Sequence, residues 1–216
     1  MSVLPFQQFS LADIPFSVEH TGPPPEGTTF REGMIDIETT HLRGDFGFIL
    51  CVVIKPVDYA PIILRTDAYP GYGTARRMND DFPLIIDLLK TLECVNRSFG
   101  WYSSNFDLKF IRTRKLIHFK ERGIENLYKV IRHGDLWRFR TKFNFHNNRL
   151  DTWMTNLTDL KKSDLRPKEW LDAAYGDKSA MDYVVAHCIL DVLGTEQVYL
   201  ILDKTPFMRN MALEVI

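Results

Sequence analysis

Residues 33–38 read Gly-Met-Ile-Asp-Ile-Glu, an apolar stretch that two acids interrupt. The pattern is typical of a short β-strand, in which residues two apart point to the same face of the sheet. Asp36 and Glu38 therefore project together from this strand. An Asp-x-Glu strand taken alone is also typical of a solvated sheet edge. The meaning of the pair therefore depends on what the rest of the chain places beside it.

The first half of the chain alternates between strand and helix patterns. Its apolar spacing predicts, in chain order, strands at 33–38, 46–55 and 61–65, a helix at 79–93, a strand at 95–102 and a helix at 105–119. The first three strands follow one another with short connections and are predicted to form an antiparallel meander.

The second half reads as helical. Residues 124–178 have the pattern of several short helices joined by polar turns, with Pro167 at the first turn of one of them. Residues 180–202 form the longest apolar helix. Three strands followed by alternating helices and strands predict an α/β fold, with a mixed sheet covered by helices in one domain.

Length and composition fit one well-cored domain. The chain has 216 residues, of which 45% are hydrophobic and 25% charged, as in ordinary globular proteins. We expect an N-terminal extension at 1–30, the domain at 31–205 and a C-terminal tail at 206–216. No apolar run reaches the roughly 18–20 residues that span a bilayer, and the N-terminus does not have the pattern of a secretory signal. The sequence therefore predicts a cytoplasmic protein with no membrane partner.

The three cysteines are Cys51, Cys94 and Cys188. Their odd number and wide spacing argue against a disulfide framework or a zinc site, so we interpret them as small buried thiols.

The charge is unevenly distributed along the chain, although the net charge is only −1. Residues 109–149 contain twelve Lys or Arg and three acids, which leaves the rest of the chain acidic. Such a split is compatible with a basic face that holds a phosphate backbone, and it is also typical of a solvated helix surface. Aromatic residues in this part of the chain are candidates for base stacking, although most are expected in the core: Trp101, Tyr102, Phe110, Trp137 and Phe139.

Further acids and a histidine stand out at two later positions. Asp107 lies at a strand-to-helix junction, and Asp191 lies on the final helix one turn after His187. Singly, Asp107 is also typical of a helix cap, and His187 of a core histidine. Asp135 and Asp151 are interpreted as acids at helix starts.

As an ordered set, the acids indicate metal chemistry. Mg²⁺ and Mn²⁺ prefer oxygen ligands, and shared cations relieve the repulsion between neighbouring carboxylates. Two such ions about 3.5–4 Å apart can act on one phosphodiester, one activating the attacking water and the other stabilising the leaving oxygen. A histidine with a pKa near neutrality can accept the proton of that water.

The order and context of these residues resemble the DEDD superfamily of 3′→5′ exonucleases, which has a ribonuclease H-like fold. Three motifs carry the resemblance, Met-Ile-Asp-Ile-Glu-Thr-Thr at 34–40, Gly-Trp-Tyr-Ser-Ser-Asn-Phe-Asp-Leu-Lys-Phe at 100–110, and Tyr-Val-Val-Ala-His-Cys-Ile-Leu-Asp-Val at 183–192. The stretches at 133–137 and 149–152 resemble the branch related to the proofreading domains of family B polymerases. The resemblance covers residues 33 to 203.

The resemblance implies a role for each matching residue. Two divalent cations, Mg²⁺ or Mn²⁺, would be held by the four acids Asp36, Glu38, Asp107 and Asp191. The residues that would border the terminal nucleotide and its cleft are Thr39, Thr40, Leu42, Ser103 and Asn105.

The third motif departs from the family pattern at His187. One branch of the family has His five residues before the last Asp, and the other has Tyr four residues before it. His187 lies four residues before Asp191, so it combines the register of one branch with the side chain of the other. The two expectations are that His187 serves as the base from this turn, or that it is displaced and leaves a slower enzyme.

The sequence thus predicts a metal-dependent 3′→5′ exonuclease that hydrolyses single-stranded DNA or RNA. The alternative is a non-catalytic nucleic-acid-binding or scaffolding module that kept the fold, and the retention of all four acids favours the enzyme. A proofreading role would need a separate polymerase or repair partner. The patterns are neutral between DNA and RNA and do not indicate an oligomeric state.

Overall fold

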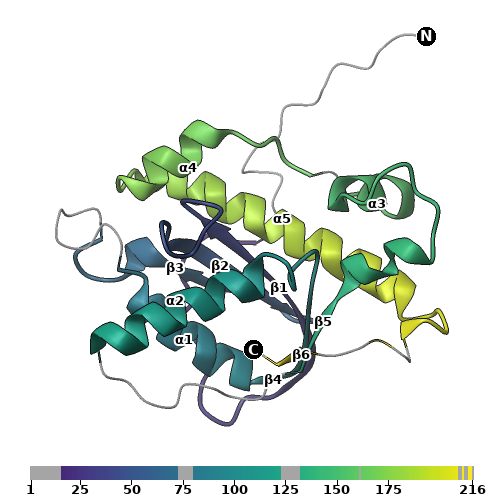
Figure 1. Ribbon diagram of the computed structural model, residues 1–216, viewed down its shortest axis with the longest axis horizontal. Helices are drawn as coiled ribbons and strands as arrows, with labels where there is room; N and C mark the ends of the chain where they lie inside the picture. Colours follow the sequence, from purple (N-terminus) through teal and green to yellow (C-terminus); the bar gives the residue numbers. More distant parts are fainter. Residues whose placement is uncertain are drawn as a thin grey trace.

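A mixed β-sheet forms the centre of the computed structural model (Figure 1). The structure describes residues 16–72, 80–122, 132–160, 162–208, 211 and 214–215. The strands are β1 (Phe30–Thr39), β2 (Ile49–Pro56), β3 (Ile62–Arg65), β4 (Val95–Gly100), β5 (Arg132–Asp135) and β6 (Glu214–Val215). Their order across the sheet is β3-β2-β1-β4-β5-β6.

The strand directions confirm the predicted fold class. β1, β2 and β3 pair antiparallel, as a meander, while β4 pairs parallel to β1 and β5 parallel to β4. β6 pairs antiparallel to β5 at the edge of the sheet. The sheet is therefore antiparallel on one side of β1 and mainly parallel on the other.

Helices cover both faces of the sheet (Figure 1). They are α1 (Phe82–Glu93), α2 (Asp107–Arg122), α3 (Leu150–Leu157), α4 (Pro167–Ala174) and α5 (Lys178–Leu202), with 3₁₀ turns at Thr66–Ala68 and Leu136–Thr141. One hydrophobic cluster joins α1 and α2 to the sheet, and a second joins α5 to the opposite face. The side chain of Asp177 accepts a hydrogen bond from the backbone of Ala180 and so begins α5.

The alternation of β1 assigns each of its residues to one of these faces. Ile35 and Ile37 pack into the cluster with α1 and α2, whereas Met34 packs into the cluster with α5. Residues two apart share a face, so Asp36 and Glu38 are directed toward α5. The register between β1 and β2 shifts between Glu38 and Thr39, which is an irregularity of the β-bulge kind.

β5 was not predicted from the sequence, which gave residues 124–178 a purely helical pattern. Residues 132–135 read Arg-His-Gly-Asp, which lacks the apolar pattern of a strand. They form a strand nevertheless, through backbone pairing with β4. Gly134 allows this close approach, since a Cβ there would lie 2.9 Å from the ring of Phe99. Residues 123–131 lie outside the described part of the chain.

The segments flanking the predicted domain contact the sheet. Thr21 donates its backbone N–H to Ile63, and His20 accepts the backbone N–H of Arg65, so the described part of the N-terminal extension runs along β3. β6 belongs to residues 206–216, which the sequence predicted to be a tail. Asn79, the first residue of the helix predicted at 79–93, lies outside the described residues, and α1 begins at Phe82.

α5 is the one helix in the described part of the chain that is long and apolar enough to cross a membrane. Its most apolar window is 78% buried within the fold, as in the core helix of a globular domain. The burial accounts for its composition, since α5 packs against β1 and β2 along one face and against α3 and α4 along others.

Candidate active site

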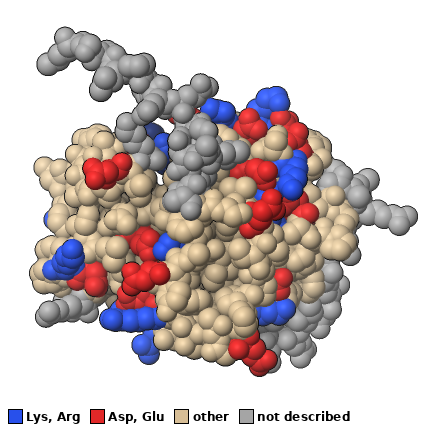
Figure 2. Space-filling model, turned by 180° about the vertical axis from the view of Figure 1, so that it is seen from behind, with Lys and Arg blue, Asp and Glu red and all other residues tan. Residues whose placement is uncertain are grey.

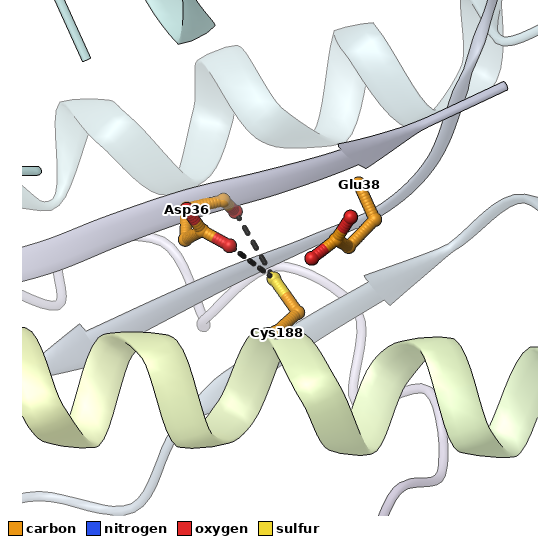
Figure 3. Close-up of side chains that lie close together, drawn as sticks. All are labelled: Asp36, Glu38 and Cys188. Atoms are coloured by element: carbon orange, nitrogen blue, oxygen red, sulfur yellow. Dashed lines mark hydrogen bonds between the residues drawn. The ribbon is translucent and has the colours of Figure 1, made fainter. Parts of the chain in front are cut away.

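Asp36 and Glu38 extend from β1 toward Cys188 on α5 (Figure 3), and the charges of Asp107 and Asp191 act on Asp36. The thiol of Cys188, on α5, donates hydrogen bonds to Oδ2 of Asp36 at 3.2 Å and to its backbone carbonyl at 3.4 Å. Burial raises the pKa of Asp36 well above its ordinary value, and the charges of Asp107 and Asp191 raise it further. The neighbouring carboxylates therefore disfavour a negative charge on Asp36.

Glu38 extends from the same face of β1 toward the helices. Its Oε2 accepts a hydrogen bond of 2.8 Å from the indole N–H of Trp170 on α4. Burial raises the pKa of Glu38 well above its ordinary value, and the charge of Asp36 adds to this shift. One neutral hydrogen bond does not balance the charge of this carboxylate.

Asp107 is the first residue of α2 and reaches back to β1. Its Oδ1 accepts the backbone N–H of Ile37 at 3.2 Å, which places this carboxylate beside the Asp36–Glu38 pair. Burial raises the pKa of Asp107 to about 7, against the lowering effect of its backbone hydrogen bonds. The junction between β4 and α2 thus contributes the third acid of the cluster.

α5 contributes Asp191 and His187 from one face, one helical turn apart. Nε2 of His187 lies 3.8 Å from Oδ2 of Asp191 and 3.9 Å from Oε1 of Glu38. Nδ1 of His187 shares a hydrogen bond of 2.5 Å with Oγ of Ser163. When Nδ1 carries the proton, Nε2 presents its lone pair to the acids. Burial lowers the pKa of His187 and favours this neutral form.

Lys162 is a basic residue in the cluster that the sequence did not indicate. Its Nζ lies 2.5 Å from Oδ2 of Asp191. Burial opposes its charge, but the attraction of Asp191, Asp36 and Glu38 is larger, so the pKa of Lys162 is raised. Lys162, Ser163 and Trp170 come from a polar loop and a short helix whose pattern contains no signal of a site.

The donors of this cluster fit a hard divalent cation. Glu38, His187 and Asp191 each offer a ligand atom within 4.8 Å of the others, as do Asp36, Glu38 and Cys188. Oδ1 of Asp191 is buried without a hydrogen-bond partner among the described residues. An unpaired buried carboxylate oxygen facing other acids is costly in the protein alone, and a cation would satisfy it.

The cluster opens into a cleft of about 800 Å³. Asp36, His187 and Asp191 lie in it beside Lys162. The cleft is also lined by three aromatic residues and by further charged ones: Trp101, Tyr102, Trp137, Arg149, Asp151 and Asp164. A cleft of this volume, lined by acids and aromatic rings, is large enough for a nucleotide.

The residues predicted to border the nucleotide fall into separate groups. Leu42 and Asn105 line a second hollow of about 250 Å³ together with Lys109, and Leu42 is 82% exposed. Thr39 donates its hydroxyl to the carbonyl of His41, at the end of β1.

The other two hydroxyl-bearing residues of that group make internal hydrogen bonds. Thr40 accepts the backbone N–H of Phe48 and so closes the loop after β1. Ser103 is buried and bonded to Nε2 of His133 at 2.7 Å.

The described part of the basic stretch 109–149 does not keep all its basic side chains at the surface. Arg114 and Lys115 are buried, and Arg114 forms an ion pair with Asp81. Acidic and basic side chains are interspersed on the face shown in Figure 2. The described basic residues of the stretch that remain exposed are Lys109, Lys120, Arg132, Arg138, Lys142 and Arg149.

Asp135, Asp151 and the cysteines have the structural places expected of them. Asp135 accepts the backbone N–H of Trp137 at the start of a 3₁₀ turn, and Asp151 lies in the first turn of α3. Cys51 and Cys188 are buried free thiols, and Cys94 is half-buried.

Comparison with known proteins was informative only at the level of structure. No protein-family model matches the sequence, and no curated protein matches it. A family B DNA polymerase from the hyperthermophilic archaeon Pyrobaculum calidifontis is similar, with a TM-score of 0.58 and 16% identity over 85% of this chain. The match covers 25% of the polymerase, so the chain spans about a quarter of its length.

Two structures of NrnC from Brucella melitensis are also similar. One has a TM-score of 0.52 and 15% identity, over 86% of this chain and 81% of that one. The other, NrnC bound to pGG, has a TM-score of 0.52 and 13% identity, over 86% and 80% of the two chains. At these identities the similarity concerns the fold, and it agrees with the arrangement of sheet and helices described above: the chain has a ribonuclease H-like fold.

Proposed function

We propose that this protein is a metal-dependent 3′→5′ exonuclease acting on single-stranded DNA or RNA. The observation that carries the proposal is the convergence of Asp36, Glu38, Asp107, Asp191 and His187 in one cluster. Asp36, His187 and Asp191 of this cluster line the cleft. Three separate elements bring these groups together although their charges repel one another. Natural folds rarely maintain such a cluster without a cation or a chemical use for it.

Each group has a specific role in the proposed reaction. Two Mg²⁺ or Mn²⁺ ions, held by the four acids, would supply an activated water and stabilise the leaving oxygen. His187, with Nδ1 held by Ser163, accepts the proton of the water at Nε2. Trp170 holds Glu38 in place through its indole N–H, and Arg149 at the cleft attracts the phosphate backbone.

The structural similarities support the same class of substrate. One similar protein is a DNA polymerase, and the other is bound to pGG in one of its structures. Both descriptions concern proteins that handle nucleic acid or its pieces. A separate polymerase or repair partner is compatible with the first similarity.

The direct test uses a single strand labelled at its 5′ end and the same strand labelled at its 3′ end, with Mg²⁺, Mn²⁺ or EDTA. We expect release of mononucleotides from the 3′ end that requires the metal. The Asp36→Ala variant should lose this activity, and Asp203→Asn, at an exposed acid on the C-cap of α5, should retain it. Activity retained in Asp36→Ala would contradict the assignment of the site. Strand binding without hydrolysis would favour the non-catalytic alternative.

The role of His187 requires its own variant. His187→Ala should lower kcat by about 10²-fold or more, as for other positioned bases, while the Kd for a single strand in EDTA stays nearly constant. Equal turnover in the variant and the parent protein would remove His187 from the mechanism. A parallel loss of turnover in Ser163→Ala, with a shifted pH profile, would show that the orientation of the ring matters.

A further inference from the structure

Three aromatic residues, Trp101, Tyr102 and Trp137, form an aromatic wall in the cleft that contains the acids. Of the five aromatic residues that the sequence offered for base stacking, Phe110 and Phe139 are buried in the core. Trp101, Tyr102 and Trp137 instead line the cleft that contains Asp36 and Asp191. The structure thus separates the aromatic residues that pack the protein from those that face the substrate space.

Tyr102 is the most accessible member of this wall. It is 45% exposed, although an aromatic ring usually gains from burial. Its backbone has a φ of 60°, in the left-handed region that bulky side chains rarely adopt. Gly or Asn would relieve this strain, so the tyrosine is maintained at a cost to stability. Strain of this kind concentrates at functional positions.

Several contacts hold Tyr102 in this conformation. Oδ1 of Asp135, at the end of β5, accepts its backbone N–H at 2.9 Å. The rings of Tyr102 and Trp137 meet edge to face, with centroids 4.8 Å apart. The guanidinium of Arg140 lies over the ring of Trp137. The support is built from β5 and the turn after it, so the ring of Tyr102 is pre-oriented before any ligand binds.

We propose that Tyr102, supported by Trp137, is a stacking subsite for a nucleobase of the substrate strand. The inference rests on the proposed function. An exonuclease site that holds the phosphates of a strand also needs a contact for the bases, and Tyr102 would supply it. Every base has a π-face, so stacking is tolerant of sequence. A base can reach the ring only when it is unpaired and turned out of a helix, so the subsite selects single strands over duplexes.

Binding to matched strands in EDTA tests the subsite. The probes are a short fluorescent oligothymidylate and the same strand with abasic residues at its 3′ end. Tyr102→Ala should weaken binding of the normal strand by about 10-fold or more and leave binding of the abasic strand unchanged. Tyr102→Phe should bind as the parent protein does. Equal weakening for both strands, or for neither, would overturn the proposal.

Two further variants separate stacking from stability. Tyr175→Ala removes a tyrosine that is 64% exposed and is not among the residues lining the cleft, and it should bind both strands as the parent protein does. Tyr102→Gly should bind as weakly as Tyr102→Ala but melt at a higher temperature, because glycine accepts the left-handed conformation. A Tyr102→Gly variant that binds as well as the parent protein would overturn the role of the ring.

The two proposals fail in different ways. Strand binding that depends on Tyr102 and on the bases, without metal-dependent hydrolysis, would overturn the exonuclease and leave the stacking subsite in place. Hydrolysis with binding indifferent to the abasic residues would overturn the subsite and leave the exonuclease. Absence of both strand binding and metal-dependent hydrolysis in the parent protein would overturn both.

Discussion

The cluster of acids around Asp36 and a charged cluster built on one buried acid, Asp81, lie on opposite faces of the sheet, and of these two the cluster of Asp81 is the balanced one. Asp81 is fully buried, and Oδ1 and Oδ2 accept hydrogen bonds from the guanidinium of Arg114. His118 lies 2.6 Å from the same carboxylate, and the backbone N–H of Ile49 completes its partners. The carboxylate of Asp81 ties β2, α1 and α2 together.

The cluster around Asp36 has the opposite balance. Asp36 and Glu38 face other carboxylates, and Lys162 is the cation that the described residues bring to them, paired with Asp191. Burial alone therefore does not distinguish a structural acid from a functional one. What distinguishes them is whether the protein itself supplies the opposite charge.

The largest effect is expected from removing one charge of the unbalanced cluster. Asp36→Asn should lower the hydrolysis rate by about 10³-fold or more, because the acids act as a unit. The same variant should raise the free energy of unfolding in EDTA by about 1 kcal/mol, since it relieves repulsion. Rates and denaturant titrations of Asp36→Asn and of Asp203→Asn check both effects. A lower free energy of unfolding for Asp36→Asn than for the parent protein in EDTA would contradict the view that the acids around Asp36 repel one another.

The balanced cluster should respond with the opposite sign. Asp81→Ala should lower the free energy of unfolding by about 3–5 kcal/mol, because it removes the carboxylate that balances the charge of the buried Arg114. Urea denaturation measures the loss. The double variant Asp81→Leu, Arg114→Met removes both charges and should recover part of it. A cost under about 1 kcal/mol for the single variant would show that Asp81 is not structural.

His133 is a third kind of buried polar group, which has neutral hydrogen-bond partners at both ring nitrogens. Ser98 and Ser103 bond its two ring nitrogens, and burial lowers its pKa to about 3. The unfolded chain binds the proton more readily, so stability falls as the pH drops from 6.5 toward 3. The loss approaches about 1.4 kcal/mol per pH unit. Denaturant titrations across this range should show a flatter profile for His133→Asn, and an unchanged profile would contradict the assignment.

The smallest effect is expected at Lys162, whose charge offsets that of Asp191 in the cluster around Asp36. Lys162→Met should lower the melting temperature in EDTA by an amount equivalent to about 1 kcal/mol, since Asp191 loses its partner. It should also increase the stabilisation by Mn²⁺, because Nζ competes with the cation for Asp191. Lys168→Met, which breaks an exposed helical pair with Asp172, is the matched control and should change neither. Weaker Mn²⁺ stabilisation in Lys162→Met would show that the lysine assists the cation.

Much of the site was predictable because its main relations are local. Asp36 and Glu38 share a face through the period of a strand, and His187 and Asp191 through the turn of a helix. The apolar patterns of β1, β2 and α5 likewise follow directly from their residues. β5 was missed because its four residues contain no apolar period, and its place depends on pairing with β4.

Local periodicity in the chain was enough for the fold class and for the strands and helices with strong patterns, whereas the candidate acids were assigned as a set through their order and the family resemblance. Tertiary packing alone brought Lys162, Ser163 and Trp170 to those acids, buried Arg114 and Lys115 instead of leaving them for a phosphate backbone, and turned Tyr102 toward the cleft. The physical reason is the separation along the sequence of the residues that are in contact. The period of a strand or helix relates residues a few positions apart, whereas contacts between distant segments depend on how whole elements pack.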